Sequence, residues 1–221
     1  MVVKEIPNMG KVVFDEFYSS KNIKINDANS SPIKDSKLVK VLDDIDNYLN
    51  NAYISSLLDK RDKYYIYSTK SNNLLSLYRY DIFIKYFYVK SYIENNNYEL
   101  FKDIYLSSIK CFNNFLEPDG SKKSKNDFIN NFNNLIDSIK NKGFTSIIPI
   151  SKTGIPIDGA HRVAICLYFK IDIYYAVFDL LDGKYDRDFF KTRGMNPKYL
   201  KIIDDLILEE GFILWFILLL F

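Results

Sequence analysis

The stretch IPIDGAHRVA, residues 155–164, holds the residues of this chain that are best suited to chemistry. An apolar run leads into Asp158 and Gly159, and a helical pattern follows with His161 and Arg162 in its first turn. The first amide groups of a helix have no internal partner and carry partial positive charge. Glycine lets a ligand approach the backbone closely, and arginine can bind a phosphate through two parallel hydrogen bonds. These residue types in this order predict an anion site.

The same residues have a purely structural explanation. In that explanation Asp158 caps the helix, His161 packs in the interior and Arg162 pairs with a surface carboxylate. His161 is the only histidine of the chain. Its place beside an arginine at a strand-to-helix turn, where it can act as a neutral or a charged donor, favours the anion site.

A second candidate site is the acidic turn EPDG at residues 117–120, which three lysines follow. Phosphoryl transfer needs a base that accepts the proton of the acceptor hydroxyl, and often carboxylates for Mg²⁺. Glu117 and Asp119 are two residues apart on a Pro-Gly turn, which could direct both carboxylates into one cleft. A solvated turn without a function is the alternative. We therefore name Glu117, Asp119 and His161 as candidate catalytic residues.

Arg79, Asp81 and Lys85 are charges in a run that is otherwise rich in Tyr, Ile and Phe. Charged residues on a mostly apolar helix are usually paired or functional. Their spacing does not place all three on one helical face, but Asp81 and Lys85 can form an i,i+4 pair. The pair is the favoured explanation, and Arg79 is free to reach the phosphate site instead. The charged segment 182–188 is expected to be a solvated connection.

Apolar periodicity predicts an α+β fold in three parts. The first, residues 1–116, is expected to be helical. The second, residues 117–180, is a small core with a helix capped by Ser124 and Gly143, a hairpin, a helix and a strand. The third, residues 181–221, is a helix with an apolar tail. The expected helices cover residues 35–58, 74–93, 98–116, 128–139, 160–169 and 197–210, and the expected strands cover residues 147–150, 155–157 and 171–178.

The core of residues 117–180 resembles the ParB/sulfiredoxin superfamily, through a helix ending in LIDSIKNKGF, a hairpin, IDGAHR, a helix and a strand. In that superfamily the turn-helix motif binds nucleotide phosphates, so the resemblance implies ATP or ADP, or CTP, as the ligand. Mg²⁺, which phosphotransferases often use, can accompany the nucleotide. The motif is most similar to the Asp-Gly-His-His-Arg of the free-serine kinases. Asp158, Gly159, His161 and Arg162 then carry over as nucleotide-binding residues, while Ala160 departs from the pattern.

Differences between this chain and the superfamily's motifs indicate which branch of the superfamily it resembles. Sulfiredoxins carry a catalytic cysteine directly before the His-Arg pair, and Ala160 at that position excludes sulfinic acid reduction. ParB segregation factors need a helix-turn-helix and a basic surface, whereas this chain has a net charge of +2, so nucleic acid is not expected as a partner. The expected function is a nucleotide-dependent phosphotransferase that acts on a small hydroxylated metabolite or sugar. A weak resemblance to proteins of bacterial surface-polysaccharide pathways suggests the context. The alternative is a non-catalytic nucleotide-switched or DNA-associated ParB-like module.

The composition limits the metal sites and the cellular compartment that we expect for this protein. One histidine cannot form a His triad for zinc, and two cysteines without a secretory leader favour the cytoplasm. The apolar end GFILWFILLLF would span about 16 Å as a helix, roughly half of a bilayer core. A membrane partner is therefore not expected, and a buried terminal strand or an end created by truncation is the preferred explanation.

Overall fold

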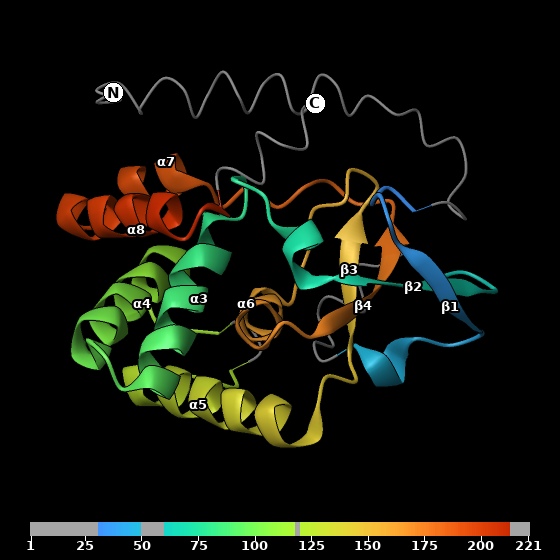
Figure 1. The fold of residues 1–221 in the computed structure, drawn as a ribbon, viewed down its shortest axis with the longest axis horizontal. Helices are drawn as coiled ribbons and strands as arrows, with labels where there is room; N and C mark the ends of the chain where they lie inside the picture. The colour runs from blue at the N-terminus through green and yellow to red at the C-terminus, as the bar shows by residue number, and fades with distance from the viewer. Residues whose placement is uncertain (1–30, 50–59, 118–119, 213–221) are drawn as a thin grey trace.

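The computed structural model of this protein describes residues 31–49, 60–117 and 120–212. Within these ranges the fold is α+β, with helices on one side of a four-stranded sheet (Figure 1). The strands, in the spatial order β1-β2-β4-β3, are β1 (Lys37–Leu42), β2 (Tyr64–Lys70), β3 (Ile147–Ser151) and β4 (Asp172–Phe178). The α-helices are α3 (Tyr80–Glu94), α4 (Tyr98–Asn113), α5 (Lys125–Lys142), α6 (Ala160–Phe169), α7 (Arg187–Thr192) and α8 (Pro197–Glu209).

The sheet is mixed. β1 pairs with β2 and β2 pairs with β4 in antiparallel register, with Tyr67 opposite Tyr175. β3 pairs with β4 in parallel, with Ile148 opposite Tyr175. Parallel neighbours need a crossover connection, and α6 provides it between β3 and β4. The motif therefore lies within this crossover, between the end of β3 and the first turn of α6.

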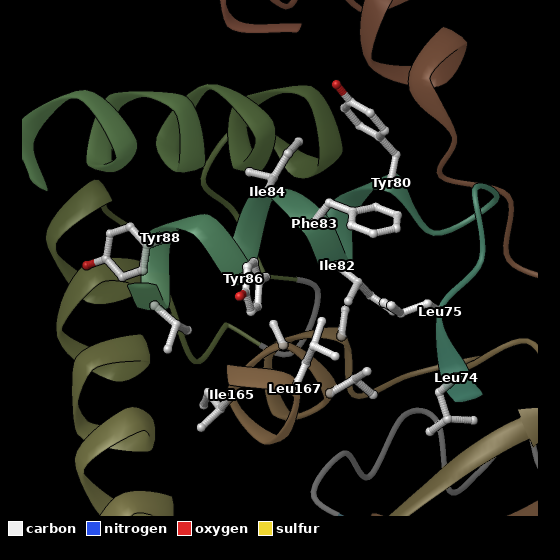
Figure 2. Close-up of a cluster of buried hydrophobic side chains, with 14 of the residues drawn as sticks. Leu74, Leu75, Tyr80, Ile82, Phe83, Ile84, Tyr86, Tyr88, Ile165 and Leu167 are labelled. Atoms are coloured by element: carbon white, nitrogen blue, oxygen red, sulfur yellow. The ribbon is translucent and has the colours of Figure 1, made fainter. Parts of the chain in front are cut away.

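α3 is the central helix of the described structure. Its sequence is apolar nearly all round, which predicts burial, and every residue from Tyr80 to Val89 is buried. Figure 2 shows side chains of α3 and α6, among them Ile82 and Leu167, meeting between the two helices. α6 also contacts β4, so it lies between α3 and the sheet (Figure 1). The motif at the start of α6 is thus held on a tightly packed frame.

Several expected elements are confirmed. Ser124 caps the start of α5, where its side chain accepts a hydrogen bond from the Asp127 amide at 3.2 Å, and Gly143, with φ +78°, caps its end. β3, α6, β4 and α8 lie within two residues of their expected bounds. α3 begins at Tyr80 rather than at residue 74, because a short 3₁₀ turn, η2 (Ser71–Leu74), and extended backbone precede it. α4 ends three residues earlier than expected, at Asn113.

The helix expected over residues 35–58 is wrong within the described residues. Residues 37–42 form the edge strand β1, and a short 3₁₀ turn, η1 (Asp46–Tyr48), follows. The leucine spacing that suggested a helix does not mark one buried face, since Leu38 is 53% exposed while Ile45 is buried. Residues 50–58 of that expected helix lie outside the described residues. Because β2 pairs with β4, the sheet joins strands from the region expected to be helical to strands of the expected core.

The hairpin after β3 has a full strand on one side only. Gly154 closes the Ser-Lys-Thr-Gly turn, and its amide donates to the Ser151 carbonyl at 2.9 Å. On the returning segment, a single bridge joins Ile150 to Pro156. Proline has no amide hydrogen to continue a ladder, which explains why no second strand forms here. The apolar end from residue 213 onward lies outside the described residues. None of the helices within the described ranges has both the length and the apolar character needed to cross a bilayer.

Candidate functional site

The turn at Asp158 and Gly159 leads directly into α6, as the sequence predicts. Gly159 has φ +87°, a conformation that favours glycine. A Cβ at this position would lie 2.5 Å from Cδ1 of Ile148 and 3.2 Å from Nη2 of Arg162. The glycine is therefore required both by its backbone conformation and by the close approach of Ile148 and the arginine.

Arg162 lies against this turn and is only 5% exposed. Its Nη2 donates to Oδ2 of Asp158 at 3.0 Å, whereas its buried Nη1 has no hydrogen-bond partner among the described residues. Burial lowers the pKa of Arg162, and the Asp158 carboxylate opposes that shift. The structural explanation for the motif is thus wrong for Asp158, which makes no side-chain cap and pairs with the motif's own arginine instead.

His161 lies half-buried among aromatic rings of α4 and α5. The rings of Phe132 and Tyr105 meet it edge-on, with centroids 4.5 and 5.7 Å away. A 2.9 Å hydrogen bond joins its Nε2 to the Tyr105 hydroxyl, and the imidazole tautomer decides which atom donates. Burial holds the pKa of His161 well below its usual 6.5, and the positive charges of Lys85 and Lys122 lower it further. The imidazole is therefore neutral at physiological pH.

Arg79, Asp81 and Lys85 form a buried ion triad beside the motif. Both oxygens of Asp81 accept hydrogen bonds from Arg79, at 2.9 and 3.0 Å, and Oδ2 also accepts one from Lys85 at 2.8 Å. The two cations lower the pKa of Asp81 despite its burial. The three side chains meet although their spacing does not place them on one helical face, because Arg79 precedes the first turn of α3 with non-helical backbone. Its side chain therefore does not follow the helical spacing.

Arg79 also connects α3 to the motif and to the segment before α7. Its Nη1 donates to the carbonyl of Pro156, two residues before Asp158. The ring of Tyr185 lies 5.2 Å from the guanidinium carbon, and the Tyr185 amide donates to the Tyr78 carbonyl at 2.7 Å. The expectation that segment 182–188 is only a solvated connection is wrong at Tyr185, and Arg187 and Asp188 begin α7.

Glu117 is the member of the acidic turn that the structure describes, and Asp119 lies outside the described residues. Oε2 of Glu117 accepts a hydrogen bond from Asn113 at 3.2 Å, and its Oε1 lies 3.6 Å from Nζ of Lys122. Glu117 contributes to the raised pKa of Tyr105, whose main cause is burial. Because Tyr105 bonds to His161, Glu117 is linked to the motif indirectly, through the effect of its charge on this tyrosine.

Sequence reasoning did not identify Tyr105 or Tyr185. Tyr105 is buried on α4, but nothing in its spacing marks it as the partner of a histidine. A separate pocket of about 200 Å³ lies beside η1 and shares no lining residue with the motif; it is lined by Asp43, Asp44, Ile45, Asp46, Leu49, Lys60, Arg61 and Tyr64. Within the described ranges, no group of three or more His, Cys, Asp or Glu side chains is arranged to hold a metal ion.

Comparison with known proteins gives no match: no protein-family model, no curated protein and no solved structure is significantly similar to this chain.

Proposed function

We propose that this protein binds the phosphate groups of a nucleotide at the start of α6 and transfers a phosphoryl group to a small hydroxylated acceptor. The observation that carries the proposal is the buried Nη1 of Arg162, which has no partner among the described residues. A buried donor without a partner costs free energy, and a bound phosphate oxygen would satisfy it. Gly159 lets the same guanidinium lie close against the turn, with Nη2 3.2 Å from where a Cβ would stand. The residues present therefore fit a phosphoryl group.

The order of elements supports the placement of residues 117–180 in a ParB/sulfiredoxin-like fold. α5, β3, the turn, α6 and β4 follow one another in the order of that resemblance, with the second strand of the hairpin reduced to a single bridge. ATP or ADP, or CTP, is then the proposed ligand, Mg²⁺ the proposed metal and the cytoplasm the proposed compartment. A sugar or other metabolite of surface-polysaccharide synthesis is the proposed acceptor.

The proposed acid–base groups lie around Tyr105. Glu117 is the candidate base for the acceptor hydroxyl, because its charge acts on Tyr105, the hydrogen-bond partner of His161. His161 is proposed to act as a neutral imidazole that hydrogen-bonds a phosphate oxygen or the acceptor. Asp119 keeps its candidate role from the sequence alone.

Calorimetric titration with ATP, ADP and CTP, with and without Mg²⁺, tests the proposal. Arg162→Ala should weaken nucleotide binding by about 1.5–3 kcal/mol, the scale of a charged hydrogen bond. Arg187→Ala is the matched control, because Arg187 forms an ion pair of similar length with Asp204 away from the motif. Equal affinity of the Arg162 variant and the parent would refute the anion site. Nucleotide binding without phosphoryl transfer to any hydroxyl acceptor would favour the non-catalytic nucleotide-switched module.

A further inference from the structure

The buried triad has more positive than negative charge. Arg79, Asp81 and Lys85 are each at most 3% exposed, and two cations share one carboxylate. The Asp158–Arg162 pair beside it is neutral as a unit. The five groups together carry a formal charge of +1 inside the protein. Burying an uncompensated charge is costly, so an anion bound here would offset part of that cost.

Hydrogen-bond donors are also left over on two of these cations. Lys85 has three ammonium hydrogens, and in the described part of the chain its one hydrogen bond is to Asp81. Its Nζ also lies 5.4 Å from the centre of the Phe112 ring. Arg162 has five donors; among the described residues one of them is used, on Asp158, and the buried Nη1 has no partner. Both side chains can therefore bind a further acceptor without breaking the bonds that hold them.

Lys85 and Arg162 act on the same small region although they come from different helices. Lys85 shares the Asp81 carboxylate with Arg79, and Arg79 donates to the carbonyl of Pro156, two residues before the Asp158 that pairs with Arg162. The Asp158 carboxylate also raises the pKa of both cations against the effect of burial. Both cations in turn lower the pKa of His161. α3 and α6 pack side by side, which keeps this arrangement fixed. The first turn of α6 thus lies within the electrostatic reach of a cation on its own helix and of a second on α3.

We propose that Lys85 and Arg162 bind the same phosphoryl group, so that the ligand is held between α3 and α6. This inference rests on the proposed function and adds a second cation to its site. Two cations and the amide groups of a helix N-terminus suit a dianionic phosphate, either a phosphomonoester or the terminal phosphate of a nucleotide, rather than a carboxylate. Asp81 is then a positioning residue that holds Lys85, and Arg79 is one that holds the turn through Pro156.

Lys85→Gln tests the inference, because glutamine removes the charge and keeps a donor for Asp81. Inorganic phosphate, ADP and acetate are titrated calorimetrically into the full chain. The variant should bind phosphate and ADP at least about tenfold more weakly than the parent, and acetate should bind the parent far more weakly than phosphate. Lys90→Gln is the matched control on the same helix, because Lys90 pairs with Glu210 away from the motif. It should bind like the parent.

The outcomes separate this inference from the proposed function. If Arg162→Ala abolishes phosphate binding and Lys85→Gln leaves it unchanged, the inference is overturned and the proposed function stands. If the parent binds neither phosphate nor any nucleotide, both are overturned. If Lys85→Gln does not fold, an NMR titration of the parent tests the inference instead. The side-chain nitrogen signal of Lys85, assigned by comparison with Lys85→Arg, should shift as phosphate is added. The midpoint of this shift should equal the midpoint measured by calorimetry. A signal that does not move would overturn the inference.

Discussion

Replacing Gly159 with alanine should destabilise the protein through two separate effects. The backbone at φ +87° disfavours any side chain, at a cost of about 1–2 kcal/mol. The added Cβ would also lie 2.5 Å from Cδ1 of Ile148, a fully buried side chain on β3 that has little room to move. Overpacking of this kind costs about 1–3 kcal/mol. The free energy of unfolding should therefore fall by roughly 2–5 kcal/mol, a large share of a typical domain's stability.

Two further variants separate these effects. Gly194, at the turn that ends α7, has a similar φ of +85°, but nothing lies within 4 Å of its added Cβ. Gly194→Ala should therefore cost only the backbone part, about 1–2 kcal/mol. Ile148→Val removes Cδ1 and by itself costs about 0.5–1.5 kcal/mol. When Gly159→Ala is added to the Ile148→Val variant, it should cost no more than Gly194→Ala does in the parent.

Equilibrium unfolding in urea measures all these free energies, and phosphate titration reports on the site. Gly159→Ala should weaken phosphate binding even where the protein stays folded, because its Cβ would lie 3.2 Å from Nη2 of Arg162. Gly194→Ala should bind phosphate normally. Equal destabilisation by the two glycine variants, or no recovery when Gly159→Ala is combined with Ile148→Val, would refute the steric argument.

Two further predictions concern the buried charges. Asp81→Asn leaves two buried cations without their carboxylate and should lower the free energy of unfolding, measured in urea, by about 3–5 kcal/mol. The control Asp205→Asn breaks an exposed pair with Lys201 and should cost less than about 1 kcal/mol. Equal losses in the two variants would contradict the role of the triad. His161 binds a proton less readily in the folded than in the unfolded state, so its contribution to stability is complete above its usual pKa of 6.5 and is lost as the pH falls below that value. The slope should reach at most about 1.4 kcal/mol per pH unit and should flatten in His161→Phe; a parent without this slope between about pH 6.5 and about pH 5 would contradict the buried neutral imidazole.

The motif at the start of α6 could be predicted because its signals are local. An apolar run, an Asp-Gly turn and a new helical pattern each depend on neighbouring residues, and the structure has them where the sequence predicts them. The ion triad could be predicted only in part. Charges in an apolar run indicated Asp81 and Lys85, but Arg79 joins them through a non-helical backbone conformation that helical spacing does not describe.

The first two strands could not be predicted, for a different physical reason. β1 is an edge strand with both faces largely exposed, so it lacks the alternation of polar and apolar residues that marks a half-buried strand. Its leucines instead continue a helical spacing into η1. The segment that forms β2, YYIYSTK, is rich in aromatic and β-branched residues, but its partner β4 lies about 100 residues later in the chain. Pairing over such a distance leaves no local signal for the sheet.

That pairing has a consequence for synthesis. β2 leaves the ribosome long before β4 does. The edge of β2 that pairs with β4 therefore stays without this partner until about 100 more residues have been synthesised. During this interval a seven-residue segment with four buried positions remains without its final partner. Such segments are prone to aggregate, and contacts between distant residues slow folding. Nascent chains halted before β4 should therefore depend on chaperones more strongly than chains that extend beyond it.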